Sequence, residues 1–348
     1  MSKQPRVVSF GEILLRLNPP GHLRFEQADR FRAHYGGAEA NVAVSLANFG
    51  LDSAFVTRLP DNRLTEACLQ SLRRYLVDLS GVYRGGKRLG IYFLEVGSTQ
   101  RGSQVVYDRA DSSMTTIQTG TIDWEKELRG ADWFHWSGIT PALSQSAADV
   151  CLEGCRAANR LGVPVSLDLN YRSKLWNYGK EPHEVMPELG ACCDFIQGDP
   201  ETSNTYFKLG VEDVEFNPDE PIDGTRLRPF VEKLHGHFDR CKYVAQTLRA
   251  SINADHNRWS GILYDGARLY TTRTFEITDM VDRIGGGDSF MAAIIYGMLM
   301  FGNDYQRALD FAVAASCLKH TIVGDVNLAR VEEVEQLMHS RGKGSVSR

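Results

Sequence analysis

Residues 131–170 read ADWFHWSGITPALSQSAADVCLEGCRAANRLGVPVSLDLN and contain one complete strand–helix–strand unit. The apolar run 131–139 predicts a buried strand, and 163–170 predicts the next. Between them, 144–162 predicts a helix that begins at a serine N-cap and ends at a glycine. Two strands joined by a helix of this length predict a parallel pair in a sheet whose two faces are both covered.

The same alternation continues toward the C-terminus. Strands are expected at 193–199 and 241–248, and helices at 287–300 and 304–320. The pattern predicts a doubly wound α/β fold with a central, mostly parallel sheet flanked by helices. Such sheets bind ligands at the carboxyl ends of their strands, so we expect functional residues just after strands.

Two regions interrupt this alternation. Residues 12–35 and 89–109 alternate apolar and polar side chains without a helix between them. They predict antiparallel strands of a small second sheet, which we expect to act as a lid over the site. We expect residues 1–340 to form a single domain, and 341–348, which are polar and contain glycine and serine, to be a frayed tail.

Composition limits the possible partners. The 348 residues are 43% hydrophobic and 24% charged, and the net charge is −5, without a cluster of Lys and Arg. We therefore expect no nucleic-acid partner. No apolar run approaches the ~20 residues of a membrane span, and the first residues do not resemble a signal peptide. Seven scattered cysteines without a matching zinc pattern predict reduced thiols in a cytoplasmic protein.

The segment DRIGGGDSFM, residues 282–291, places three glycines before an acid and an apolar helix. Main-chain N–H groups at a helix N-terminus lack intrahelical acceptors and attract anions. Gly285, Gly286 and Gly287 would let a phosphate approach this backbone closely. Asp288 would then accept a proton from an attacking hydroxyl. The alternative is a flexible helix entry in which Asp288 is only a cap.

A family resemblance favours the catalytic interpretation. DRIGGGDSFMAAIIYG, from residue 282, resembles the C-terminal signature of ribokinase-like (PfkB) sugar kinases. GGAEANVAVSLANFG, residues 36–50, resembles their N-terminal signature, and the two lie in the right order about 240 residues apart. The resemblance implies a ribokinase-like fold with a β-lid, ATP and Mg²⁺ as cofactors, Asp288 as general base, and Gly285, Gly286 and Gly287 as an anion hole.

Within the family, the chain is most similar to 2-keto-3-deoxygluconate kinases. WSGITPALS (136–144), SLDLNYR (166–172) and VYDR (106–109) carry this likeness. It implies phosphorylation of 2-keto-3-deoxygluconate to its 6-phosphate. A sugar acid carries a carboxylate that needs a cation when it is buried, preferably an arginine. Arg109 and Arg172 each follow a predicted strand and are expected to supply it.

Other expected sugar contacts come from the lid and the pocket floor. The alternatives are half-buried strand aromatics for the tyrosines, a surface ion pair for Arg172, and a strand-end cap for Asn170 and for Asp168. The further residues expected to bind the sugar are Gly37, Asn41, Tyr92, Tyr107 and Asn170.

Two stretches depart from the family pattern. Many members have N-x-x-E after a strand, where the glutamate helps to hold magnesium; here the stretch is GDPE, with Gly198 in place of Asn and Glu201 retained. Where T-L-G-x-x-G is usual, Thr247 is retained and Arg249 replaces the glycine. We expect Glu201 near the metal, and Thr247, Arg249 and Gly287 near the nucleotide.

Several points stay open at this stage. Adenine is expected near 319–327, and His320 is expected to cap helix carbonyls rather than to act as a base. The rival functions are a kinase for a neutral sugar such as fructose or a nucleoside, and a non-catalytic sugar or nucleotide sensor. A monovalent cation is a possible additional cofactor. Exposed strand edges of the lid predict a homodimer through the lid.

Overall fold

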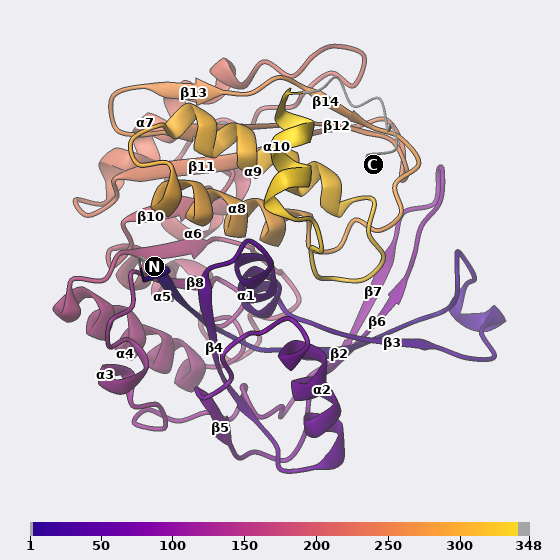
Figure 1. The fold of residues 1–348 in the computed structure, drawn as a ribbon, viewed down its shortest axis with the longest axis vertical. Helices are drawn as coiled ribbons and strands as arrows, with labels where there is room; N and C mark the ends of the chain where they lie inside the picture. Colours follow the sequence, from indigo (N-terminus) through magenta and orange to yellow (C-terminus); the bar gives the residue numbers. More distant parts are fainter. Residues whose placement is uncertain (1–2, 340–348) are drawn as a thin grey trace.

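A ten-stranded sheet forms the centre of the protein, shown in Figure 1. The computed structural model describes residues 3–339, so the predicted tail 341–348 lies outside the described residues. The strand order is β13-β12-β11-β10-β9-β8-β1-β4-β5, with β14 also paired to β12. The strands are β1 (Arg6–Phe10), β4 (Asp52–Leu59), β5 (Val82–Arg84), β8 (Trp133–Ser137), β9 (Val165–Asp168), β10 (Phe195–Gln197), β11 (Tyr243–Ser251), β12 (Asn257–Tyr264), β13 (Leu269–Thr271) and β14 (Phe275–Ile277).

The neighbouring strands β5, β4, β1, β8, β9, β10 and β11 run parallel to one another. In contrast, β12 pairs antiparallel with β11, β13 and β14. Successive side chains of a strand point to opposite faces of the sheet. Accordingly, Trp133 and Phe195 contribute to one apolar core, while Phe134 and Ile196 contribute to the other. The mostly parallel, doubly wound sheet is therefore confirmed.

Helices cover both faces of this sheet (Figure 1). One core contains side chains of α1, α8, α9 and α10, and the other contains those of α4 to α7. The helices are α1 (Ala38–Asn48), α2 (Arg63–Arg73), α3 (Trp124–Glu127), α4 (Gln145–Leu161), α5 (Pro182–Gly190), α6 (Pro200–Phe207), α7 (Arg228–His237), α8 (Gly286–Met300), α9 (Tyr305–Lys319) and α10 (Val331–His339), with 3-10 turns at Phe25–Gln27 and Gly224–Leu227.

The helix α4 begins and ends where its sequence predicts. Ser144 accepts a hydrogen bond from the main-chain N–H of Ala147, and Gly162 adopts the left-handed conformation with φ +72°. The predicted strand 241–248 is longer than expected, because β11 continues to Ser251 and turns back as β12. Arg249 consequently lies on a strand, opposite Trp259.

A separate four-stranded sheet projects to one side of the body in Figure 1. We call this sheet the lid; its strands are β2 (Leu14–Asn18), β3 (Arg32–Gly36), β6 (Ile91–Glu95) and β7 (Gln104–Asp108), in the order β3-β2-β6-β7. The prediction of purely antiparallel strands is wrong in one respect, since β2 and β6 run parallel. Their connection passes through the main sheet, which returns the chain in the same direction.

Two further features of the described chain concern its cysteines and its helices. All seven cysteines are free, and five of them are buried. Among residues 3–339, every helix is too short or too polar to cross a membrane.

Candidate active site

Polar residues gather at the carboxyl ends of β9 and β10 and beside the middle of β11. They line a hollow of about 250 Å³ together with Gly287 from the start of α8. The carboxyl ends of parallel strands are where α/β sheets bind ligands. The polar residues of this smaller hollow include Asp168, Asn170, Arg172, Asp199, Thr202, Gln246 and Thr247.

A second hollow of about 540 Å³ adjoins the first. Both are lined by Arg172, Asp199, Gln246, Thr247 and Gly287, so they form one continuous cleft. The larger hollow adds apolar and charged side chains from β11, β12, α6 and the turn before α8. These include Glu201, Phe216, Arg249, Trp259, Met280, Arg283 and His320.

The three glycines before α8 serve different purposes. Gly285 has φ +82°, and a Cβ there would lie 1.9 Å from the Asp325 carbonyl oxygen. A Cβ on Gly286 would lie 2.8 Å from Cε1 of His320. A Cβ on Gly287 would meet nothing within 4 Å, and this residue borders both hollows. Packing therefore explains the first two glycines, while the third leaves space for a ligand.

Asp288 lies in the first turn of α8 and is held by a residue of the other signature. The Asn41 Nδ2 donates to the Asp288 Oδ2 at 2.7 Å, across 247 positions of sequence. Burial raises the pKa of Asp288 to about 6, although the Asn41 hydrogen bond and the Arg172 charge both lower it. No side chain caps α8. The Asn41 hydrogen bond thus orients the Asp288 carboxylate, and a pKa of about 6 leaves it mostly ionised at neutral pH, as a general base requires.

Gly37 supports this arrangement from the start of α1. Its N–H donates to the Asn41 Oδ1 at 3.4 Å, and a Cβ on Gly37 would lie 2.0 Å from the Glu12 carbonyl oxygen. Gly37 therefore allows α1 to begin close to β2. Within the described residues Gly37 and Asn41 act on the position of Asp288, and their expected contact with sugar stays a prediction.

Two further acids lie near Asp288: Asp168, for which the sequence left a strand-end cap as the alternative, and Glu39, which sequence reasoning missed. Burial, followed by the negative charge of Asp288, raises the pKa of Asp168 to about 8. Burial also raises the pKa of Glu39 to about 7. Glu39 accepts hydrogen bonds from Ser137, at the end of β8, and from Thr140. Of these two acids, Asp168 borders the smaller hollow.

The expected lid contacts are engaged with protein groups. Arg109 is buried and forms an ion pair with Glu12, and its guanidinium carbon lies 5.6 Å from the Tyr107 ring centroid. The Tyr92 hydroxyl donates to Asp325. These three side chains do not line either hollow of the cleft. Their contact with sugar remains a prediction, and Arg172 is the expected carboxylate ligand that borders the cleft.

A buried ion cluster joins the lid to the glycine turn. Arg16 of β2 donates to Asp282 at 2.7 Å and to Asp325 at 3.2 Å. Burial opposes the charge, but the two carboxylates hold the pKa of Arg16 above its usual value. Lys319 places its Nζ 3.1 Å from the Ile322 carbonyl oxygen. This cluster, Arg16 with Asp282, Asp325 and Lys319, supports the turn that carries Gly285.

Comparison with known proteins agrees with this geometry. The profile described as pfkB family carbohydrate kinase matches residues 4–198 and 261–329. This chain belongs to the PfkB family. It is a kinase that transfers a phosphoryl group to an alcohol.

Relatives of this PfkB kinase cover nearly its whole length. A 2-dehydro-3-deoxygalactonokinase of Haloferax volcanii is 30% identical, over 97% of this chain and 98% of its own. The crystal structure of a 2-dehydro-3-deoxygluconokinase from Thermotoga maritima is 44% identical, with a TM-score of 0.89, and the match covers 97% of this chain and 100% of that one. The ribokinase-like fold is therefore shown.

All the residues that the sequence predicts near nucleotide and metal border the larger hollow: Glu201, Thr247, Arg249 and Gly287. Glu201 lies exposed in the first turn of α6, beside Asp199. Within residues 3–339 no group of three His, Cys, Asp or Glu forms a metal cage. Mg²⁺ keeps most of its waters and is often held by one carboxylate and substrate phosphates, so Glu201 fits that role. A Cβ on Gly198 would lie 2.3 Å from Leu169 Cδ1, so a side chain there would require Leu169 to shift.

Thr247 and Arg249 of β11 line the larger hollow, as does His320. The His320 Nδ1 lies 2.7 Å from the Ser316 carbonyl oxygen, and burial lowers the pKa of this histidine to about 4. The expectation that His320 caps helix carbonyls is confirmed. It packs against Trp259 at a centroid distance of 4.9 Å.

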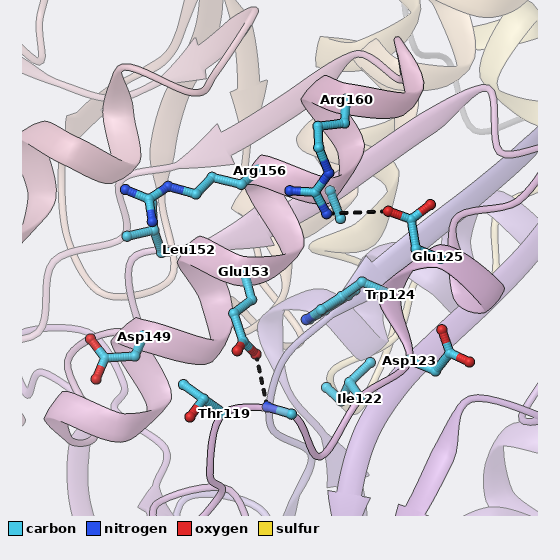
Figure 2. Close-up of a pocket in the computed structure, with 12 residues that line it drawn as sticks. Thr119, Ile122, Asp123, Trp124, Glu125, Asp149, Leu152, Glu153, Arg156 and Arg160 are labelled. Carbon is cyan, nitrogen blue, oxygen red and sulfur yellow. Dashed lines mark hydrogen bonds and ion pairs between the residues drawn. The ribbon is translucent and has the colours of Figure 1, made fainter.

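Another hollow, of about 660 Å³, lies between α3 and α4 (Figure 2). Its charged side chains already have protein partners. Arg160 is paired with Glu125 at 3.2 Å, and Glu153 accepts from the Gly120 N–H at 3.2 Å. None of the residues lining it belongs to the glycine turn or to the cleft. We therefore place the active site in the cleft beside Gly287.

Proposed function

We propose that the protein is an ATP-dependent kinase for 2-keto-3-deoxygluconate, forming its 6-phosphate. The open space in front of Gly287, beside the hydrogen-bonded pair Asn41 and Asp288, carries this proposal. The relative from T. maritima, named for this sugar acid, supports the choice of substrate.

In this mechanism the sugar occupies the smaller hollow and the nucleotide the larger one. Asp288 accepts the proton of the sugar hydroxyl as its oxygen bonds to the terminal phosphorus of ATP. The bond from that phosphorus to its bridging oxygen breaks, and ADP leaves. Main-chain N–H groups at the start of α8 stabilise the charge of the transferred group. Mg²⁺, held near Glu201, would neutralise phosphate charge.

Arg172 is the basis for an acidic substrate. It is exposed at the cleft, and its guanidinium donates only to the Tyr171 carbonyl within residues 3–339. A free guanidinium binds a carboxylate in a bidentate manner. Asn170, Tyr92, Tyr107 and Arg109 are proposed to complete the sugar site. A neutral sugar such as fructose is the alternative, and a monovalent cation remains a possible additional cofactor.

The relative from H. volcanii introduces a second sugar acid. That relative is named for 2-keto-3-deoxygalactonate instead of 2-keto-3-deoxygluconate, and the match covers 97% of this chain. The assay therefore compares ADP release with 2-keto-3-deoxygluconate, 2-keto-3-deoxygalactonate and fructose. We expect the first to give the highest kcat/KM.

Replacement of Asp288 by Asn tests the reaction itself. We expect Asp288→Asn to lower kcat by about 10²–10⁴-fold, because the amide cannot accept the proton. Asp219→Asn, a matched change at an exposed loop position, should leave kcat unaltered. An unchanged rate for Asp288→Asn would exclude this residue as base, and no turnover by the wild type with any of the three sugars would favour a sensor.

Replacement of Arg172 tests the substrate class. Arg172→Gln should raise KM for the sugar acid while leaving the weaker use of fructose unaffected. Equal activity of variant and wild type on the acid would refute the carboxylate contact. The seven free cysteines suit the proposed cytoplasmic location, and we propose that the enzyme is a homodimer through the lid.

A further inference from the structure

Two arginines face the larger hollow without an anionic partner. Arg249 extends from β11, and Arg283 extends from the turn that leads to Gly285. Within residues 3–339 neither guanidinium makes a hydrogen bond or an ion pair. The buried arginines Arg16 and Arg109, by contrast, are both paired with carboxylates.

The two side chains also repel each other. Arg249 is exposed as a residue, but desolvation of its guanidinium, followed by the positive charge of Arg283, lowers its pKa. Like charges held at one site destabilise each other unless an anion lies between them. Two positive charges therefore border one hollow, where both would attract a multiply charged anion.

The acids of the same hollow do not pair with these two positive charges. Asp199 is committed to the N–H and hydroxyl of Thr202, at 2.7 and 3.0 Å. Glu201 and Asp213 also border the hollow, and neither forms an ion pair with the two arginines. The cations thus remain available to a ligand.

Their position relates them to the glycine turn. The Arg283 carbonyl accepts the Gly286 N–H at 3.4 Å, so Arg283 belongs to the same turn as the proposed anion hole. Arg249 lies on β11, the strand that also carries Thr247. Both arginines border the hollow that also reaches Gly286 and Gly287.

We propose that Arg249 and Arg283 form a guanidinium pair that binds the phosphate chain of the nucleotide. Arg283 binds the terminal phosphates, because it is closest in sequence to the glycine turn, and Arg249 binds the phosphates nearer the ribose. Guanidiniums bind phosphate oxygens in a bidentate manner. This inference rests on the proposed function and assigns to Arg283 a role that the sequence motifs do not suggest.

Calorimetric titration of the full-length protein with ATP, ADP, AMP and adenosine tests the pair. We expect Arg283→Gln and Arg249→Gln each to weaken ATP binding at least tenfold. ADP should be weakened similarly, AMP less, and adenosine not at all, since only the phosphates contact the pair. Arg129→Gln, at an exposed arginine without side-chain partners, is the matched control and should bind like the wild type.

Kinetics provide a second measurement. Both variants should raise KM for ATP and leave KM for the sugar acid unchanged. Arg283→Lys keeps the positive charge but loses the planar guanidinium, so its KM for ATP should lie between those of wild type and Arg283→Gln. This variant also provides the test if Arg283→Gln does not fold. Variants that fold and bind ATP within twofold of wild type would overturn the pair alone. A wild type that binds no adenine nucleotide would overturn the proposed function together with it.

Discussion

Gly285 and Gly287 are two residues apart and are glycines for different physical reasons. The first has a left-handed backbone pressed against the Asp325 carbonyl, and the second faces the open cleft. A side chain at Gly285 would disturb folding, whereas one at Gly287 would disturb only the approach of a ligand. Substitution of each by alanine separates the two roles.

Gly285→Ala should lower the free energy of unfolding by at least about 1–2 kcal/mol, the cost of the left-handed conformation. Gly287→Ala should be as stable as wild type, since alanine favours helix, but should lose most of its kinase activity. Urea unfolding and coupled ADP release measure the two effects. Full activity of Gly287→Ala would show that nothing approaches this backbone.

The pKa of Asp288 predicts the pH dependence of the kinase. The base must be ionised, so kcat/KM should fall as pH decreases through about 6. Asn41 lowers this pKa, and Asn41→Leu should therefore raise it and move the acidic limb to higher pH. The matched change Asn48→Leu removes another amide hydrogen bond of α1, to the Asn327 carbonyl, and should leave the limb in place. A limb that does not move in Asn41→Leu would contradict the assignment of the base.

At the scale of elements, β2 of the lid is anchored to the main body by buried charge. Arg16→Met would leave Asp282 and Asp325 without their cation. Loss of one partner from a buried ion pair costs about 3–5 kcal/mol of unfolding free energy. The control Arg88→Met breaks an exposed lid pair with Asp108, which is worth about 0–1 kcal/mol. Similar stabilities of the two variants, measured by urea unfolding, would refute the anchor.

Elements also show what local sequence can predict. The boundaries of α4 follow from Ser144 and Gly162, because capping depends on neighbouring residues. The extension of β11 to Ser251 was not foreseen, since that part of the strand is stabilised by pairing with β12. The parallel pairing of β2 with β6 was missed for a similar reason: the two are distant in sequence.

At the scale of the molecule, the lid exposes apolar side chains. Val106 is 52% exposed and Phe31 is 41% exposed. The ring centroids of Phe31 and Phe93 lie 5.9 Å apart. The edge strands β3 and β7 also leave main-chain groups available for pairing with a second copy. These features support the proposed homodimer.

Sedimentation velocity should therefore show a dimer that Val106→Asp converts to monomer. Leu76→Asp places the same charge on a residue that is 87% exposed at the end of α2, and should not alter the assembly. A wild type that sediments as a monomer would contradict the proposal. So would a Val106→Asp variant that remains a dimer.

The local sequence determined the alternation of strands and helices, the glycine turn and the acid that follows it, because these depend on periodicity and on a few adjacent residues. It also indicated Arg172, since residues after parallel strands meet at one sheet edge, and the family pattern indicated Thr247, which lies within β11. Only the tertiary structure decided that Asn41 donates a hydrogen bond to Asp288, that Glu12 pairs with Arg109, and that Arg283 and Arg249 border the same hollow. Charges and hydrogen bonds act through space, and the fold alone brings such distant residues within their short range.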